Sequence, residues 1–297
     1  MEKINVTFLG TSDSIPSKMR NHTSILLSYK NENILIDCGE GTQKQFKLAN
    51  ISPFALTKIL ITHWHGDHIL GLPGLLQTLA MLNYNKTLKI YGPKGTENKI
   101  SLIKNLVNIE VPLEIHEVEN QVIQDKEFLI ETKSMLHTAH CNAYSFVLKE
   151  KRRLDKKKLK KYKLPNSNIL KQLQQGKDIM HNNKKIKSSQ VSYLEEGKKI
   201  TFILDTATNQ NAINLAKDSD LLIIESSFSK EEKSKAEKFK HLTSVDAAAI
   251  AKQAKVKRLI LTHISQRYEY NLSKIEKEAK KLFKNTSLAK DLQRITI

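Results

Sequence analysis

The sequence is poor in cysteine: of its 297 residues only Cys38 and Cys141 carry thiols. Two cysteines this far apart make neither a disulfide framework nor a zinc ribbon. No window approaches the roughly 18 consecutive apolar residues of a membrane-spanning helix, which argues against an integral membrane protein. The first residues alternate apolar and polar from Ile4 to Phe8, as a strand does, and do not resemble a signal peptide. We therefore expect a cytoplasmic protein.

Arginine is also scarce, since 43 of the 49 basic residues are lysine, and the formal net charge is +18. The excess gathers in residues 150–187, where 14 basic residues face three acidic ones. Such a run fits a solvated face or a disordered loop, and it equally fits an arm that binds the phosphates of a polyanion. Few aromatic residues interleave the lysines, which disfavours base stacking on single strands along this segment. The candidate substrate-binding lysines are Lys156, Lys157, Lys158, Lys160 and Lys161.

Short apolar runs bounded by Gly, Asn or Asp alternate with segments of helical spacing. We expect strands at 4–10, 24–29, 33–39, 58–62, 88–91, 128–135, 144–148, 199–204, 220–225 and 258–262. We expect helices at 68–82, 94–106, 210–217, 243–256 and 271–284, with Thr243 or Ser244 capping the fourth. This order predicts two sheets with helices outside. The segment at about 150–195 interrupts the pattern and reads as an inserted, projecting arm in a single domain of residues 1–297.

The strongest chemical signal is Thr62-His-Trp-His-Gly-Asp-His68, directly after a buried strand. His63 and His65 point to the same side of an extended chain, and Gly66 permits a turn that returns Asp67 and His68 toward them. Imidazole and carboxylate ligands suit Zn²⁺, with Mn²⁺ or Fe²⁺ as alternatives. Four ligands so close in sequence fit two ions better than one ion with an open position.

A two-ion site needs further ligands at other strand ends. Asp205 ends the run KITFILD and is placed to bridge two ions, and His263 ends RLILTH. Another histidine should come from the loop 136–141, which holds both His137 and His140. The residues themselves leave the choice between these two histidines open.

The motif His63-x-His65-x-Asp67-His68 resembles the signature of the metallo-β-lactamase superfamily. Further stretches are similar, in order, to one family within it, ribonuclease Z. These stretches are Phe8-Leu-Gly-Thr-Ser12, Pro16-Ser-Lys-Met-Arg-Asn21, Asp37-Cys-Gly-Glu-Gly-Thr-Gln43, Gly71-Leu-Pro-Gly-Leu75, Gly92-Pro-x-Gly95, Asp205-Thr206, Asp220-Leu-Leu-Ile-Ile-Glu225, His241-x-Thr243 and Leu261-Thr-His-Ile-Ser-Gln-Arg-Tyr268. The chain departs from the family at Trp64, where an aliphatic residue is usual, and at Leu164-Pro-Asn-Ser-Asn168, where the arm often carries Gly-Pro.

The resemblance implies a four-layer αββα sandwich with a projecting basic arm. It also implies two Zn²⁺ per subunit, a homodimer, and the removal of 3′ trailers from precursor tRNA, with a 3′-OH left on the tRNA and a 5′-phosphate on the trailer. The metal ligands that it implies are His63, His65, Asp67, His68, Asp205, His263 and, from the spacing to Ala143-Tyr144, His137. Asp67 would also act as general base, and His241, oriented by Glu225, would protonate the leaving oxygen. Arg267, with Tyr268 beneath it, would bind a phosphate.

Three other functions compete with this interpretation. Another hydrolase of the superfamily, acting on small phosphodiesters or esters, would use the same metal site, because fold and metals do not fix the substrate. The basic segment and the His241-x-Thr243 motif favour RNA. A non-catalytic RNA-binding protein would be expected to lack ligands or base, and a structural zinc site is typically closed and rich in cysteine.

Overall fold

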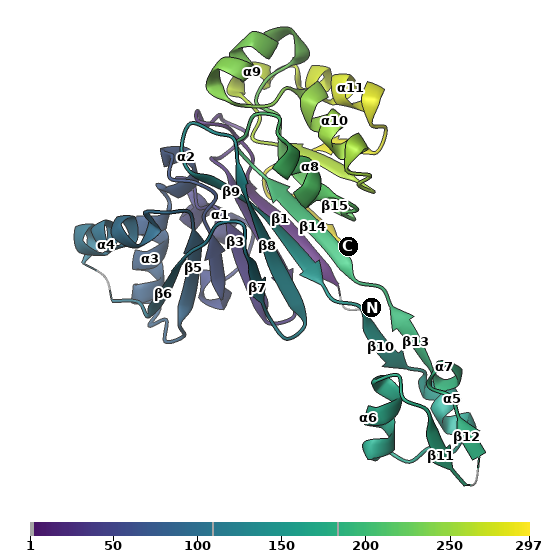
Figure 1. Ribbon diagram of the computed structural model, residues 1–297. Coiled ribbons are helices and arrows are strands. Elements are labelled where there is room, and N and C mark those ends of the chain that lie inside the picture. Colours follow the sequence, from purple (N-terminus) through teal and green to yellow (C-terminus); the bar gives the residue numbers. More distant parts are fainter. Residues whose placement is uncertain (1–2, 109, 183) are drawn as a thin grey trace. The chain divides into compact units, whose positions relative to one another are not determined.

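The computed structural model describes residues 3–108, 110–182 and 184–297, and its chain divides into two compact units (Figure 1). Of the described residues, the larger unit comprises those of 3–124, 130–146 and 199–297, and the smaller those of 125–129 and 147–198. No helix among the described residues is long and apolar enough to cross a membrane.

The first large sheet has seven strands, mostly from the N-terminal third of the chain. Their spatial order is β18 (Arg294–Thr296), β1 (Ile4–Gly10), β2 (Ser24–Tyr29), β3 (Glu32–Ile36), β4 (Lys58–Leu60), β5 (Leu88–Gly92) and β6 (Leu113–Glu117). Pairing is antiparallel from β18 to β3 and parallel from β3 to β6. The carboxyl ends of β3 and β4 therefore lie at the same edge of this sheet, next to each other.

The second large sheet also has seven strands. Their order is β17 (Thr286–Leu288), β16 (Leu259–Thr262), β15 (Leu221–Glu225), β14 (Lys198–Ile203), β9 (Cys141–Leu148), β8 (Phe128–Met135) and β7 (Val122–Gln124). The strands β14 to β17 are parallel. The carboxyl ends of β14, β15 and β16 thus open onto one edge.

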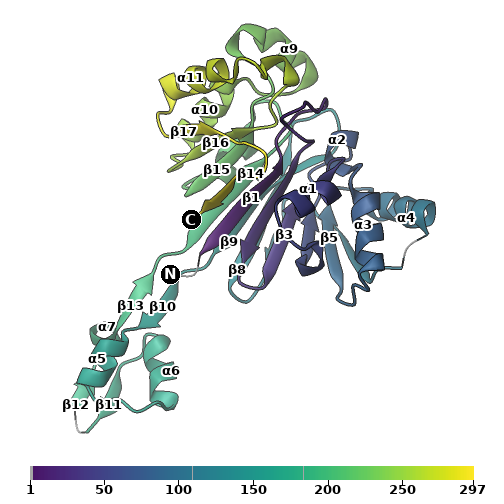
Figure 2. The ribbon, with the colours of Figure 1, turned by 180° about the vertical axis from the view of Figure 1, so that it is seen from behind.

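Helices cover the outer face of each sheet (Figures 1 and 2). Beside the first sheet lie α1 (Thr42–Leu48), η1 (Pro53–Ala55), α2 (Gly66–Ile69), α3 (Leu72–Met81) and α4 (Thr96–Val107). Beside the second lie α8 (Gln210–Ala216), η2 (Lys230–Glu232), α9 (Lys233–Phe239), α10 (Ser244–Gln253), η3 (Gln266–Tyr268) and α11 (Leu272–Leu282). Separate buried clusters join each set of helices to its sheet, one around Leu75, Ile90 and Ile100 and the other around Ile224 and Ile250.

Aromatic residues connect the inner faces of the two sheets. The rings of Tyr29 on β2 and Phe146 on β9 are 5.9 Å apart. The Tyr144 hydroxyl on β9 donates a hydrogen bond of 2.7 Å to the carbonyl of Ile61, just after β4. Helix, sheet, sheet and helix are therefore stacked in that order, and the predicted four-layer αββα sandwich is confirmed.

The predicted helix 68–82 is wrong in one respect, because the structure breaks it into α2 and α3. Pro73 stands in the first turn of α3, where its missing N–H costs nothing, so the chain starts a new helix there. At the break, a side chain on Gly71 would have its Cβ 2.0 Å from the carbonyl oxygen of Gly39. The absence of that side chain lets the loop after β3 lie against the loop after β4.

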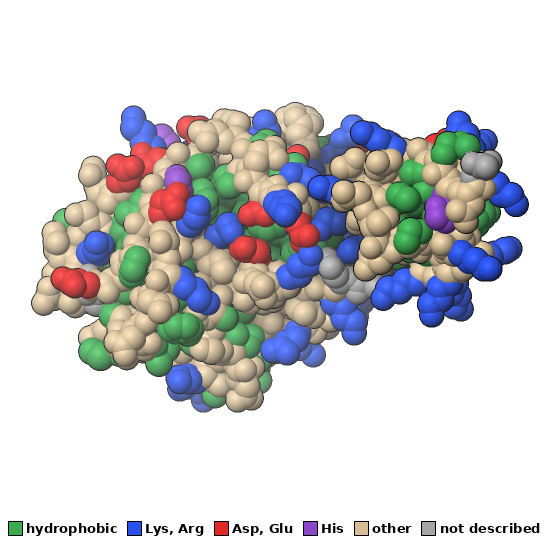
Figure 3. Space-filling model, turned by 90° about the horizontal axis from the view of Figure 1, so that it is seen from below, with side chains coloured by type: hydrophobic (Ala, Val, Ile, Leu, Met, Phe, Trp, Pro, Cys, Tyr) green, Lys and Arg blue, Asp and Glu red, His purple; other side chains and the backbone are tan. Residues whose placement is uncertain are grey.

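The smaller unit has its own elements and a small core. It contains β10 (Lys151–Leu154), α5 (Lys156–Lys161), α6 (Asn168–Gln174), β11 (Ile179–His181), β12 (Lys184–Ile186), α7 (Ser188–Val191) and β13 (Ser192–Glu195). Leu173, Ile179, Ile186 and Val191 are buried together at its centre. In Figure 3, Lys and Arg side chains border the surface of this unit, at the right of the view. The sequence pattern did not predict these elements individually.

Candidate metal centre

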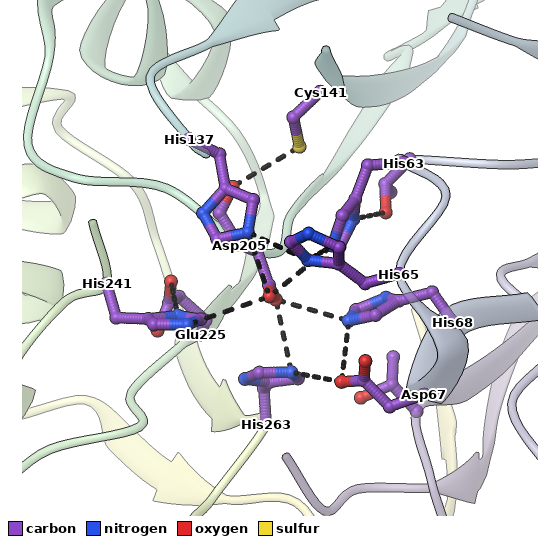
Figure 4. A network of polar contacts seen from close by, with 12 residues as sticks. His63, His65, Asp67, His68, His137, Cys141, Asp205, Glu225, His241 and His263 are labelled. Atoms are coloured by element: carbon purple, nitrogen blue, oxygen red, sulfur yellow. Dashed lines mark hydrogen bonds and ion pairs between the residues drawn. The ribbon is translucent and has the colours of Figure 1, made fainter. Parts of the chain in front are cut away.

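The candidate site forms where several strands end, at one edge of both sheets (Figure 4). The motif from His63 to His68 follows β4, and Asp205 follows β14. His263 directly follows β16, and His137 lies in the loop between β8 and β9. Sequence segments up to 200 residues apart therefore contribute to one cluster, as the pattern of polar residues after apolar strands predicted.

The first donor group comprises His63, His65, His137 and Asp205, whose ligand atoms lie within 4.8 Å of one another. His65 presents Nδ1, which is 2.9 Å from His63 Nε2 and 3.2 Å from His137 Nε2. Asp205 Oδ2 is 3.6 Å from Nε2 of both His63 and His137. Ligand atoms around a tetrahedral Zn²⁺ with bonds of about 2.0–2.1 Å stand about 3.3 Å apart, so this group fits one such ion.

The second donor group comprises Asp67, His68, Asp205 and His263. His68 Nε2 is 3.1 Å from Asp67 Oδ2 and 3.3 Å from Asp205 Oδ1. His263 Nε2 is 3.3 Å from Asp67 Oδ2 and 3.1 Å from Asp205 Oδ1. Asp205 thus belongs to both groups, with Oδ2 facing the first and Oδ1 facing the second.

Two buried candidate ligand atoms in this cluster form no well-aligned hydrogen bond. Among the described residues, His68 Nε2 and Asp205 Oδ1 are enclosed without one, although the two atoms are only 3.3 Å apart. Leaving such a group unsatisfied costs about 1–3 kcal/mol of folding free energy, so a cluster of this kind normally binds a ligand. The donor types, their spacing and these two atoms all fit a divalent cation, and the structure therefore has a His and Asp cluster suited to divalent metal.

The electrostatics of the cluster favour ionised carboxylates. Burial raises the pKa of Asp205, but the neighbouring His263, His68 and His241 outweigh it and hold that pKa well below its usual range. Burial lowers the pKa of His68, and the charges of Asp205, Asp37 and Asp67 then raise it well above its ordinary value. A proton on His68 thus compensates the carboxylates when no cation does, and metal binding would release it.

In four of the rings, those of His63, His68, His137 and His263, the second nitrogen has a fixed partner that orients the ring. His68 Nδ1 lies 2.6 Å from Asp37 Oδ2. Asp37 also accepts hydrogen bonds from the backbone N–H and the hydroxyl of Thr62. Because that hydroxyl donates to Asp37, it accepts from His63 Nδ1 at 3.1 Å. With Nδ1 as the donor, the Nε2 atom of His63 is an acceptor, and that of His68 becomes one when the extra proton leaves, which is the form that binds a metal.

Similar partners hold His263 and His137. The Ser227 hydroxyl donates to Glu225 Oε2 and so accepts from His263 Nδ1 at 2.8 Å. His137 Nδ1 donates to the carbonyl of Lys240 at 3.1 Å. His137 is buried and belongs to the first donor group, whereas His140 is exposed and lies outside both groups. Of the two histidines that the sequence pattern left open, the structure places His137 in the candidate cluster.

His241 lies beside the cluster and is held by Glu225. Its Nδ1 is 2.8 Å from Glu225 Oε1, and its Nε2 is 3.9 Å from Asp205 Oδ2. Burial lowers the pKa of His241, but the charges of Glu225 and Asp205 and the hydrogen bond that His241 donates to Glu225 outweigh burial and raise the pKa to about 10. These two carboxylates therefore favour the protonated form of this imidazole.

A cavity of about 350 Å³ opens over this cluster. It is lined by Asp13, Ser14, His65, Asp67, His137, Thr138, Asp205, Ser227, Phe228, Phe239, His241, His263 and Arg267. The Arg267 guanidinium is 2.9 Å from Glu232 and 5.1 Å from the centre of the Phe228 ring. Tyr268 is buried, with its hydroxyl accepting from the N–H of Ser229. The five predicted arm lysines lie elsewhere, exposed on α5 of the smaller unit.

Sequence reasoning did not assign roles to Asp37, Thr62, Ser227 or the Lys240 carbonyl. Asp37 carried a usable signal, since it ends the apolar strand β3 as Asp205 and His263 end theirs. Asp37 and His263 both have left-handed backbones, with φ of 56° and 55°. Such strain at non-glycine residues is concentrated at functional sites, but it appears only in the folded chain.

Known proteins match this chain over nearly its whole length. A ribonuclease Z of Bacillus cereus is 39% identical, with 96% of this chain and 97% of that protein covered. A ribonuclease Z of Nanoarchaeum equitans is 38% identical, with 91% and 86% covered. The chain belongs to the ribonuclease Z family. It is accordingly an enzyme of the hydrolase class, and the predicted resemblance is confirmed.

Two solved structures and one family model complete this picture. The human tRNase Z, short form, superposes with a TM-score of 0.71 at 26% identity and covers 98% of both chains. The metallo-β-lactamase fold protein YhfI of Bacillus subtilis superposes with a TM-score of 0.73 at 18% identity over both whole chains, which shows the shared fold. The sequence model of the family described as "Anti-Pycsar protein Apyc1" matches residues 4–183, so the chain falls within that family as well.

Proposed function

We propose that this protein is an endoribonuclease that removes 3′ trailers from precursor tRNA by hydrolysis, leaving a 3′-OH on the tRNA and a 5′-phosphate on the trailer. The observation that carries the proposal is the pair of donor groups sharing Asp205, with the His241–Glu225 pair beside them. Relatives named ribonuclease Z support the choice of RNA, and a solved relative is named tRNase Z.

The donor geometry supports two Zn²⁺ per subunit, with Mn²⁺ or Fe²⁺ as alternatives. His63, His65, His137 and Asp205 would hold one ion, and Asp67, His68, Asp205 and His263 the other. Such ions, when bound, would make a bound water acidic and shield the charge of the scissile phosphate. In His63, His68, His137 and His263 the second ring nitrogen already has a defined partner, so these rings need little reorganisation to bind a metal.

The chain's own groups then handle the protons. Asp67 is ionised and reaches the cavity, where it would orient the attacking water and accept its proton. His241 is protonated and held by Glu225, where it would give a proton to the leaving ribose 3′-oxygen. Arg267 lines the same cavity and would bind a phosphate near the cut, exchanging its contact with Glu232.

The smaller unit is proposed as the arm that binds tRNA. Its α5 displays Lys156, Lys157, Lys158, Lys160 and Lys161, all of them exposed. Lysines on one short helix suit the phosphates of an A-form stem, whose shape is read without base contacts. The proposal thus gives the insertion predicted at about 150–195 the function of binding tRNA.

Two further proposals concern assembly and compartment. A homodimer is supported by apolar side chains that are more than half exposed on, or directly after, the outer helices of the first sheet: Leu48, Leu70, Met81, Leu102 and Leu106. A protein interface would cover such apolar side chains. A cytoplasmic location is supported by the two cysteines, which are buried as free thiols.

The decisive experiment incubates the metal-loaded protein with 5′-labelled precursor tRNA and maps the cut at nucleotide resolution. We expect one cut at the 3′ end of the mature sequence, after the discriminator base or after CCA, and loss of that cut on adding a chelator. If a protein shown to hold two metals hydrolyses a simple phosphodiester but leaves this RNA intact, the activity is that of another metallo-β-lactamase-fold hydrolase.

A further inference from the structure

One exposed aromatic side chain in the catalytic cavity has no role in the chemistry proposed above. Phe228 and Phe239 both line a cavity whose other walls are mostly polar. Phe228 is 6% exposed, whereas Phe239 is 49% exposed. A large apolar ring held half in water at a catalytic cavity requires an explanation, because exposing it forgoes burial energy.

Phe228 is already covered by its neighbours. Its ring centre is 6.1 Å from that of His241 and 5.1 Å from the Arg267 guanidinium carbon. Phe228 therefore packs against these two polar side chains. It has little surface left for a ligand.

Phe239 differs, because the charged side chain over its ring is a flexible lysine. The Lys238 ammonium lies 5.6 Å from the ring centre. A lysine side chain can swing aside for a ligand, and its charge suits the phosphate that accompanies every nucleotide base. The ring is thus available for stacking with a cation next to it.

The chain fixes Phe239 relative to the proton donor. Phe239 is the last residue of α9, and Lys240 follows in a left-handed conformation with φ of 56°. The Lys240 carbonyl accepts from His137, the Lys240 ammonium donates to the carbonyl of His137, and His241 comes next. The end of α9 therefore positions the aromatic ring, a candidate metal ligand and the proton donor together.

We propose that Phe239 is a stacking platform for the base of the nucleotide on the 5′ side of the cut. This inference rests on the proposed function, in which His241 protonates the 3′-oxygen of that same nucleotide. A group two residues from His241 on the cavity wall faces the nucleotide that carries the leaving oxygen. Stacking on an aromatic ring tolerates any base and is stronger for the larger surface of a purine.

The test compares Phe239→Ala with the wild-type protein, both metal-loaded, on two forms of one precursor tRNA. One form has its normal nucleotide before the cut, and the other has an abasic sugar there. Stacking acts on the bound substrate and the transition state alike, so its loss raises KM and leaves kcat nearly unchanged. We expect KM on the normal RNA to rise about 5- to 150-fold.

The abasic RNA separates stacking from damage to the site. With no base to stack, wild type and Phe239→Ala should cleave it with equal efficiency, and Phe239→Tyr should behave as wild type on both forms. In addition, the wild type should cleave RNA with a purine before the cut better than RNA with a pyrimidine, and the alanine variant should lose this preference.

Equal losses on the normal and abasic forms would overturn the stacking role, as would a normal KM for Phe239→Ala on the normal RNA. These outcomes do not contradict the proposed function, because each compares the cleavage kinetics of Phe239→Ala with those of a wild type that does cleave the RNA. Failure of the wild type itself to cut the normal precursor refutes the proposed function and the stacking role with it.

Discussion

At the scale of single residues, the candidate site depends on one carboxylate and on the second nitrogens of the imidazoles. Asp205 is buried and faces both donor groups, so neither group is complete without it. Asp37 and Ser227 point the rings of His68 and His263 toward those groups. These two imidazoles are therefore positioned by residues that do not themselves belong to a donor group.

Replacement of Asp67 by Ala tests the proposed division between catalysis and binding. Because Asp67 lies at the cluster, cleavage should fall by at least about 10²-fold. We expect tRNA affinity to come mainly from phosphate contacts elsewhere. The dissociation constant of precursor tRNA should change only severalfold. Cleavage assays, filter binding and metal analysis of the same preparation measure this, and a parallel loss of binding would contradict the assignment.

The pair of His241 and Glu225 predicts a pH effect with a definite sign. The pKa of His241 is raised to about 10, so the imidazole is protonated below that pH and loses its proton above it. Glu225→Gln removes the charge that raises this pKa, and kcat/KM should begin to fall at a lower pH than in the wild type. Glu231→Gln, at an exposed residue paired with Lys274, is the matched control and should keep the wild-type profile. An unshifted profile for Glu225→Gln would argue against His241 as the proton donor.

At the scale of elements, strand ends and helix breaks bring the site together. Parallel pairing places the carboxyl ends of β14, β15 and β16 together at one edge of the second sheet. It likewise places the carboxyl ends of β3 and β4 together at one edge of the first sheet. The break between α2 and α3 at Gly71 allows the loop after β3 to reach the metal motif. The position of each functional residue is thus a consequence of sheet topology more than of local propensity.

The start of α10 carries a prediction about stability. Thr243 caps this helix by accepting from the N–H of Asp246, and its hydroxyl donates to the Asp246 carboxylate at 2.6 Å. Thr243→Ala should lower the free energy of unfolding by about 1 kcal/mol, and the melting temperature by about 2–4 °C. Thr243→Ser keeps the hydroxyl and should recover most of the loss in a thermal unfolding experiment. Equal losses for both variants would assign the effect to the methyl group instead.

At the scale of the whole molecule, the lysine-rich helix α5 and the candidate metal cluster belong to different compact units. The cluster and its cavity lie in the larger unit, and the exposed lysines of α5 lie in the smaller one. Substrate affinity and the chemical step should therefore respond to separate sets of mutations.

Removing the charge of α5 tests this separation. The variant replaces five lysines by glutamine: Lys156, Lys157, Lys158, Lys160 and Lys161. KM for precursor tRNA should rise and its dependence on salt should weaken, because fewer counterions are released on binding. Hydrolysis of a small chromogenic phosphodiester should stay unchanged.

A second variant controls for total charge. It replaces five lysines of the larger unit by glutamine: Lys274, Lys277, Lys280, Lys281 and Lys284. It should affect KM for precursor tRNA less than the α5 variant does. Equal effects of the two variants, or an equal loss on the small substrate, would count against a binding role for the smaller unit.

The sequence by itself determined the features that depend on local order along the chain. Strands β1, β2 and β8 begin and end at the predicted residues, because alternating or continuous apolar runs specify a strand directly. The dense motif from His63 to His68 and the polar residues Asp205 and His263 after apolar strands were also visible there. These features need no knowledge of distant contacts.

Only the tertiary structure decided which distant groups meet. It placed His137 in the first donor group and left His140 exposed, although the two histidines stand three residues apart in one loop. It also brought Asp37 onto His68 across 31 residues and set Phe239 on the cavity wall. Side-chain direction in a loop and contacts between strand ends depend on packing of the whole sheet, which no local pattern encodes.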